Sequence, residues 1–236
     1  MKKALLLARH DIIGQYSERN SLFRALLFTA LPIILVVVNR GSASARGSSD
    51  VLILVFALYS ALLPAASAVT AAAGSFAGEK EAQTLVPLLA APIRDIDIVA
   101  GKLLATLLPS SVLSAVSIVA FDLAARYEFG AERVARILSP EILYALVALA
   151  VFFVLTLSSW VMVLSSRANT QRSAQQIAGF MIAGMFIGLT ALGGLAAQNI
   201  GSDLVLGVIL AVLASDVVAL ELARRLWNRE EAIARV

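Results

Sequence analysis

The sequence predicts an all-α polytopic membrane protein, and three observations support this fold class. Of its 236 residues, 60% are hydrophobic and 15% are charged, whereas soluble domains are about half apolar and a quarter charged. The mean hydropathy of +0.88 leaves too little polar sequence to cover a water-facing surface. Apolar blocks recur at a length that suits spanning helices, each of which needs about 20 residues, so short connections leave room for roughly six spans. A large soluble catalytic domain does not fit beside them.

Six apolar blocks within one domain, residues 1–236, are expected to cross the membrane. The polar, charged or Gly/Ser-rich stretches between them are expected to be loops. Pro32, Pro64 and Pro109 fall inside the first three blocks. We expect kinks there rather than helix ends, because neighbouring helices can satisfy the freed carbonyl groups. The expected spans are residues 22–39, 51–75, 103–121, 141–164, 176–198 and 204–223.

The distribution of basic residues predicts the orientation. On the six-span map, 14 of the 19 Lys and Arg residues lie on the side that holds both termini, and five lie on the other side. The positive-inside rule therefore predicts cytoplasmic termini and a multi-pass protein of the cell (inner) membrane. The same asymmetry accounts for most of the net charge of +3, so no nucleic-acid partner is predicted.

The first twenty residues, 1–20, are expected to form an interfacial helix that precedes the first span. Their apolar and charged residues separate onto different faces, as is typical of a helix in the headgroup plane. A solvated tail is the alternative interpretation. The rough apolar face comprises Leu5, Leu6, Ala8, Ile12, Ile13 and Tyr16.

Several kinds of chemistry are not expected in this chain. It has no cysteine for a disulfide, a thiolate metal site or a nucleophile, and its single histidine, His10, cannot form a multi-histidine site. No phosphate-binding Gly-x-x-x-x-Gly-Lys-Ser/Thr loop occurs. We therefore expect no catalytic residue, no metal ligand, no resident cofactor and no enzymatic activity of its own, with energy supplied by another chain.

Asp216 is the clearest ionisable residue at expected membrane depth. Such residues are often functional, and Asp216 could bind a cation or pair with a substrate. In the other interpretation, it lies near enough to the cytoplasmic side for water or Arg172 to satisfy it. The functional interpretation would make the chain an ATP-independent secondary transporter or channel.

The stretch 76–102, between the second and third expected spans, carries the most informative motif. Ala82, Leu85, Val86 and Leu89 recur at helical spacing beside polar residues, which predicts a short amphipathic helix on the cytoplasmic side. Thr84 is expected to cap this helix, with Pro87 in its first turn and Pro92 at its end. Asp95 and Asp97 suit the start of the next helix, where negative charge meets exposed backbone N–H groups. Such a helix can lie on lipid or fit an apolar groove of a partner.

This motif resembles the signature of ABC-2 type transporter permeases. The run Gly-Glu-Lys-Glu-x-x-Thr-Leu-x-x-Leu-Leu-x-x-Pro-Ile begins at Gly78 and is followed by Gly101-Lys102-Leu103-Leu104. Two weaker pieces stand in the family's order, Arg19-Asn20-x-x-Phe23 after the interfacial helix and Ala174-Gln175-Gln176 before the fifth span. The resemblance covers the whole chain in topology, and residues 76–104 carry its most specific motif.

The resemblance implies that the chain is the permease subunit of an ATP-driven exporter. In this family the helix after the second span is a coupling helix that docks on a separate ATP-binding subunit. Two permease copies with two ATP-binding subunits, which carry ATP and Mg, would form the transporter, and a lipid, drug-like or other hydrophobic compound is a plausible substrate. A non-transporting membrane anchor for a cytoplasmic partner is a further alternative. The coupling role falls to Glu79, Glu81, Thr84, Leu85, Leu88, Leu89 and Pro92.

Small residues suggest where a second permease copy, most simply an identical one, could pair. Ala57, Ala61 and Ala65 recur every fourth residue in the second span, and Gly184 and Gly188 form a Gly-x-x-x-Gly pair in the fifth. Small side chains let helices approach closely in lipid. Packing within one protomer explains either motif equally well.

Overall fold

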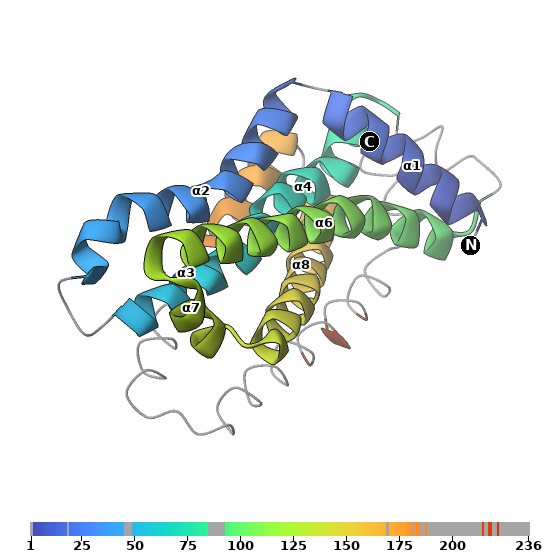
Figure 1. Cartoon of the computed structure of the whole chain (residues 1–236). Helices are drawn as coiled ribbons and strands as arrows, with labels where there is room; N and C mark the ends of the chain where they lie inside the picture. The colour runs from blue at the N-terminus through green and yellow to red at the C-terminus, as the bar shows by residue number, and fades with distance from the viewer. Residues whose placement is uncertain are drawn as a thin grey trace.

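The regular elements of the computed structural model are all helices where the chain is described (Figure 1). The described residues are 2–17, 19–44, 49–84, 93–168, 170–180 and 182–184, with positions 187, 214, 217, 218 and 221. The helices are α1 (Lys2–Ser17), α2 (Arg19–Ser44), α3 (Ser49–Leu62), α4 (Ala65–Glu81), α6 (Asp95–Phe129), α7 (Ala131–Ile137) and α8 (Pro140–Arg167).

Four helical stretches in the described part of the chain are long and apolar enough to cross a membrane. They correspond in order to the first four expected spans, which confirms the all-α class of a multi-pass membrane protein. Most of the expected spans 176–198 and 204–223 lies outside the described residues, so the count of six stays a prediction. The four stretches are Ser21–Val38, Leu52–Glu81, Ile96–Phe129 and Pro140–Ser165.

The helices extend further than the apolar blocks indicated. The second expected span continues to Glu81 and the third begins at Asp95, so the connection between them is shorter than 76–102. On the opposite side, 122–140 was expected to be a loop, but α6 runs on to Phe129 and α7 follows it. Charged residues with good helix propensity prolong a helix that an apolar block has started. The turn between α6 and α7 falls at Gly130, whose φ of +91° favours glycine.

Pro64 lies in a different setting from Pro32 and Pro109. Pro32 and Pro109 lie inside the uninterrupted helices α2 and α6. Pro64 lies at the turn that separates α3 from α4, although both halves belong to one long apolar stretch. There the chain tightens, because the N–H groups of Ala66 and Ser67 donate to the carbonyl groups of Leu63 and Pro64, three residues back.

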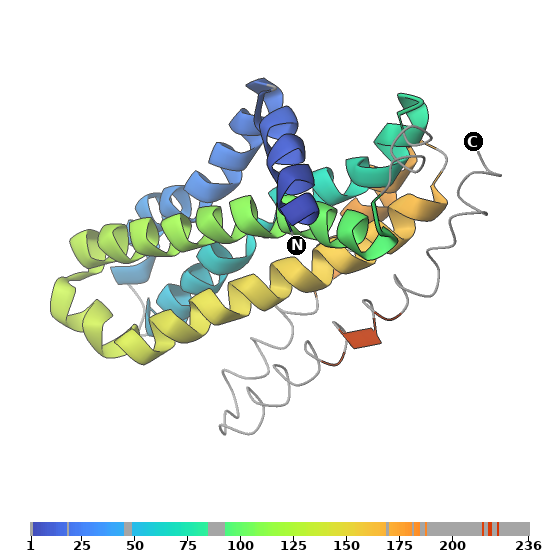
Figure 2. The same cartoon turned by 90° about the vertical axis from the view of Figure 1, so that its right-hand side faces the viewer.

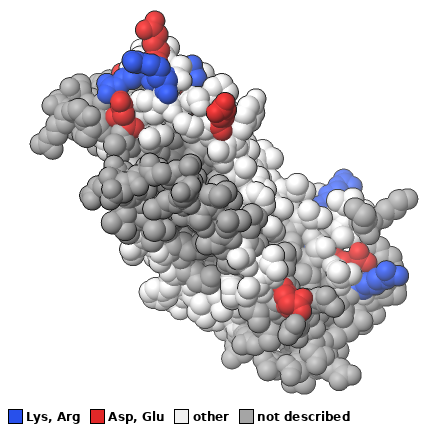
Figure 3. Space-filling model, turned by 90° about the horizontal axis from the view of Figure 1, so that it is seen from below, with Lys and Arg blue, Asp and Glu red and all other residues white. Residues whose placement is uncertain are grey.

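The stretch that contains α3 and α4, together with α8, forms the centre of the bundle, and α2 and α6 lie outside it. In the central pair 67% and 61% of the most apolar window is buried, against 22% for α2 and 33% for α6. The outer helices expose large apolar side chains such as Phe23 and Leu26 on α2 and Val112 and Leu123 on α6. Charged side chains gather toward the two ends of the described surface in Figure 3. This distribution suits a bundle surrounded by hydrocarbon.

Buried hydroxyl groups join the helices across the apolar core. Ser67 of α4 and Ser110 of α6 lie 3.2 Å apart between their Oγ atoms, and Ser117 donates to the carbonyl group of Thr29 on α2 at 3.0 Å. Small hydroxyl side chains allow helices to approach closely and satisfy one another without water.

Helix α1 packs across the first part of α6 (Figure 2). Of its expected apolar face, Ala8 is buried, whereas Leu5, Leu6 and Ile13 are exposed. The contact depends on Gly101, where an added Cβ would lie 3.0 Å from the carbonyl oxygen of Ala4. The placement of α1 in the headgroup plane stays a prediction.

Replacing Gly101 by leucine should separate α1 from α6, because backbone and side-chain atoms occupy the space that the new side chain needs. We expect a loss of about 1–3 kcal/mol in the free energy of unfolding, the usual cost of overpacking. Thermal unfolding in detergent measures it. Gly179→Leu is the matched control, since nothing lies within 4 Å of its added Cβ. Equal unfolding temperatures for the two variants would show that the close approach contributes nothing.

Candidate functional site

The end of α4 and the start of α6 border the segment that carries the sequence motif. Helix α4 closes in a Schellman motif, in which the N–H of Thr84 donates to the Glu79 carbonyl group and that of Gln83 to the Lys80 carbonyl group. Gln83 takes the left-handed conformation (φ +56°) in which glycine is usual. The Thr84 hydroxyl also turns back toward Glu79 O, at 3.4 Å. Thr84 therefore takes part in closing α4. Its expected role as the cap of the following short helix stays a prediction, because residues 85–92 lie outside the described residues. Helix α6 begins at Asp95 as predicted.

Lys102, on the second turn of α6, is the central residue of this region. Its side chain is 1% exposed, so its ammonium group must be paired inside the protein. Nζ donates to Glu79 Oε1 and to the Ser75 carbonyl oxygen, both at 2.6 Å, and lies 5.0 Å from the centre of the Phe76 ring. All three partners belong to one turn of α4, so the contact joins α4 firmly to α6.

A second carboxylate approaches the same ammonium group from α1. Asp11 Oδ2 lies 4.0 Å from Lys102 Nζ, and His10 Nδ1 lies 3.6 Å from Asp11 Oδ1. Asp11 and Glu79 keep 26% and 23% of their side chains exposed, although the Oε2 atom of Glu79 is buried. With His10 neutral, the cluster of Asp11, Glu79 and Lys102 carries a formal charge of −1.

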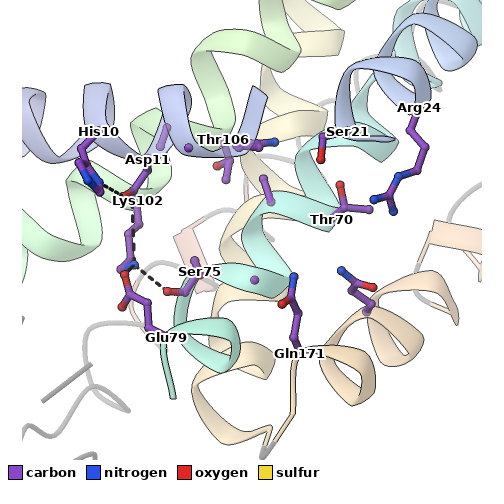
Figure 4. Close-up of a pocket in the computed structure, with 16 residues that line it drawn as sticks. His10, Asp11, Ser21, Arg24, Thr70, Ser75, Glu79, Lys102, Thr106 and Gln171 are labelled. Carbon is purple, nitrogen blue, oxygen red and sulfur yellow. Dashed lines mark hydrogen bonds and ion pairs between the residues drawn. The ribbon is translucent and has the colours of Figure 1, made fainter. Parts of the chain in front are cut away.

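A polar cavity of about 300 Å³ opens beside this cluster. Its walls come from α1, α2, α4, α6 and the stretch 170–175 (Figure 4). Arg24 and Ser21 reach it from α2, across from Lys102, and Thr70 and Gln171 lie between the two sides. Near α1, burial raises the pKa of the Tyr16 phenol above its ordinary value, which keeps that group neutral. Among the described residues no group of three potential ligands could hold a metal ion.

Two glycines of α4 bring Gln171 against the helix backbone. A Cβ at Gly74 would lie 3.1 Å from Gln171 Nε2, and one at Gly78 would lie 3.2 Å from its Oε1. The amide therefore occupies a notch that only these glycines leave open. Nearby, Ser165 of α8 accepts hydrogen bonds from the N–H groups of Phe76 and Ala77 and donates to the Ala73 carbonyl oxygen at 2.7 Å. The end of α4 is thus fixed on two sides.

The structure describes only part of the expected coupling set. Glu79 lies at the Lys102 cluster, as a residue that pairs with a neighbouring element should, and Glu81 and Thr84 are exposed. The other members, Leu85, Leu88, Leu89 and Pro92, lie outside the described residues, as does Asp216. The coupling role and any role of Asp216 therefore stay predictions.

The expected pairing residues fall in different surroundings. Ala57, Ala61 and Ala65 are at most 1% exposed, because they pack inside the protomer against its own helices. Gly184 is exposed, and Gly188 lies outside the described residues. The alanine repeat is thus buried within one chain, and pairing of two copies through the alanines or the glycines stays a prediction.

Sequence reasoning missed the residues that complete the site. Lys102 was noticed only as part of a Gly-Lys pair, and Asp11, Arg24 and Gln171 were assigned no binding role. One signal was available, since a lysine at the start of an apolar span needs a carboxylate partner if it faces the bundle. The carboxylate that pairs with it in the structure is Glu79, 23 positions earlier on the preceding helix.

Comparison with known protein families agrees with this architecture. Residues 12–210 match the family described as ABC-2 family transporter protein. The chain belongs to the ABC-2 transporter family. No curated protein matches it closely enough to add a more specific relationship. Membership makes this ABC-2 protein a membrane transport permease of a family that generally works with ATP-binding subunits.

Breaking the Glu79–Lys102 pair should destabilise the ABC-2 chain more than removing both partners. Glu79→Met should cost about 2–3 kcal/mol of unfolding free energy, slightly below the usual cost of a broken buried pair because Glu79 is partly exposed. The double variant with Lys102→Met should recover most of this loss. Thermal unfolding of both single variants and the double variant in detergent measures the coupling.

The matched control is the exposed pair Arg133–Asp50, whose atoms approach to 2.7 Å at side-chain exposures of 40% and 58%. Removing an exposed pair should change the stability by less than about 1 kcal/mol. Strictly additive effects of Glu79→Met and Lys102→Met would contradict the interpretation of Lys102 as a paired buried charge.

Proposed function

We propose that this ABC-2 protein is the membrane permease subunit of an ATP-driven exporter. Two copies, most simply a homodimer, would form the translocation path and bind two separate ATP-binding subunits. The observation that carries the proposal is the buried Glu79–Lys102 ion pair, with 2.6 Å between Nζ and Oε1. It ties together the two ends of the motif-bearing segment in a chain that belongs to a transporter family.

The segment between α4 and α6 acts in this proposal as the coupling element. Because Glu79 lies in the last turn of α4 and Lys102 in the second turn of α6, a force applied to the segment would reach both membrane stretches together. Ser165 and Gln171 hold the same end of α4 against α8 and the stretch after it. A displacement of the segment would thus move the central helices of the bundle as a unit.

The orientation follows from the basic residues. On the six-span map, 14 of the 19 basic residues lie on the side that would hold both termini and the coupling segment, which supports a cytoplasmic location of that side in a cell (inner) membrane protein. ATP and Mg would bind to the partner subunit. They would not bind to this chain, whose sequence holds no phosphate-binding loop. The spans would supply the path, and closure of the ATP-binding pair would supply the energy for export of a hydrophobic or amphiphilic substrate.

Two substitutions in the coupling segment should abolish transport while the protein still inserts. Glu81→Ala removes an exposed carboxylate, and Leu85→Asp puts a charge where an apolar anchor is needed in a docking groove. We expect loss of the partner's stimulated ATP hydrolysis by about tenfold or more, the effect of losing a central interface anchor. Co-purification and ATPase measurements with the ATP-binding subunit in proteoliposomes test this expectation.

Glu132→Ala is the control, since Glu132 is an exposed carboxylate on α7 at the opposite end of the bundle. Full activity of both coupling variants would refute the docking role. Transport without any ATP-binding subunit would favour the secondary transporter or channel, and stoichiometric binding without transport would favour the membrane anchor.

A further inference from the structure

The charges around the polar cavity are separated into two ends. At one end, which we name the acidic end, Asp11 and Glu79 flank Lys102, with a formal charge of −1 when His10 is neutral. At the other, the basic end, Arg24 stands with Ser21, and Thr70 and Gln171 lie between the two ends. Among the described residues that line the cavity, the charged or titratable ones are His10, Asp11, Arg24, Glu79 and Lys102. Its total formal charge is therefore zero, but its two ends have opposite signs.

The carboxylate oxygens at the acidic end can accept more hydrogen bonds than Lys102 donates to them. Glu79 uses Oε1 for Lys102, and its Oε2 makes no hydrogen bond within the described residues. Asp11 lies at ion-pair rather than hydrogen-bond distance from Lys102. Two carboxylates that share one ammonium group favour a second cation, and a primary ammonium group offers three donors to such a pair.

The basic end carries the groups that bind phosphate esters. A guanidinium group has five N–H donors in a planar fork, which matches a phosphate and leaves donors for more than one contact. The hydroxyl groups of Ser21 and Thr70 and the amides of Gln171 and Gln175 line the cavity around it. The notch formed by Gly74 and Gly78 fixes the Gln171 amide in place.

An apolar stripe begins beside Arg24 and runs along α2. Phe23, Leu27, Ile34 and Val38 share one face of the helix and expose 43–72% of their area. At 1.5 Å per residue the stripe is roughly 22 Å long, more than half of a hydrocarbon core about 30 Å thick. A soluble ligand would have no use for this stripe, whereas the alkyl chains of a lipid would follow it.

We propose that the polar cavity binds the headgroup of a zwitterionic phospholipid, with the phosphate at the basic end, the ammonium group at the acidic end and the acyl chains along the α2 stripe. The site stands on the geometry of this chain alone; only the role of the lipid as transported cargo rests on the proposed function. An anionic lipid without an ammonium group would satisfy one end and leave the other unpaired.

Native mass spectrometry of the full chain in detergent tests the proposal by counting retained lipids. The probes are a phosphatidylethanolamine and a phosphatidylglycerol with identical acyl chains. The unmodified chain should retain phosphatidylethanolamine about tenfold better, as expected for one additional hydrogen-bonded charge contact. Asp11→Asn should remove this preference without weakening phosphatidylglycerol, and Asp11→Glu should restore it. Arg24→Gln should weaken both lipids.

Matched controls are Arg19→Gln, at the start of the same helix α2, and Asp50→Asn, at the far end of the bundle, neither of which lines the cavity. Thr70→Val keeps the side-chain shape and should also weaken the retention of both lipids. This variant tests the polar cavity as the binding site if a charge variant fails to fold. Equal retention of both lipids by the unmodified chain would overturn the proposal. So would variants of Asp11, Arg24 and Thr70 that behave like the controls.

Glycerophosphoethanolamine, the headgroup without acyl chains, separates a lipid from a soluble ligand. If this headgroup compound fails to displace the phospholipid at equal concentration, the result supports a lipid ligand. Full displacement would overturn the proposal in favour of a soluble zwitterionic ligand. The lipid assay contains no ATP-binding subunit, so its result is independent of the ATPase measurement made with that subunit. Lipid selectivity here, together with no coupled ATP hydrolysis in that measurement, would keep the site and refute the exporter. Coupled hydrolysis without selectivity would refute the site alone.

Discussion

One buried positive charge organises the end of the bundle where the candidate site lies. An ammonium group removed from water is costly unless carboxylates and carbonyl groups replace its hydration. Lys102 meets this constraint through Glu79, the Ser75 carbonyl group and Asp11, which come from α4 and α1. The path of α1 over α6 and the extension of α4 to Glu81 bring these partners within reach. Gly101 permits the first of these arrangements, because any larger residue would hold α1 away from α6.

The pairing of the buried Lys102 also explains why the segment between α4 and α6 has a fixed base, by which we mean the joined helix ends on its two sides. A long connection held only by its own residues would move independently of the helices that it joins. Here the last turn of α4 is bound to α6 through Lys102, to α8 through Ser165 and to the 170–175 stretch through Gln171. In the proposed function, such a base would convert motion of the segment into motion of the bundle.

The sequence predicted features that depend on composition and local pattern, and missed those that depend on tertiary contact. Apolar length alone located the first four membrane stretches, and Asp95 and Asp97 correctly marked the start of α6. Thr84 was expected only to cap a helix that lies outside the described residues, and its part in closing α4 was missed, because a cap residue carries no sign of every neighbour that it serves. The burial of Lys102 and the meeting of Gln171 with Gly74 and Gly78 join residues 23 to 97 positions apart, and no local pattern encodes such distances.

Glu79 belongs both to the base of the coupling segment and to the wall of the polar cavity. A cation that enters the acidic end would share the carboxylate that holds Lys102, and would therefore change how tightly α4 and α6 are joined. Coupling between two sites is reciprocal, so a partner that shifts the segment would change the affinity of the cavity by the same free energy. A permease with few charges inside its spans needs such a shared residue, because the helices offer little else through which ligand and partner can sense each other. In the proposed function, the Glu79–Lys102 ion pair would therefore link cargo binding to an external source of energy.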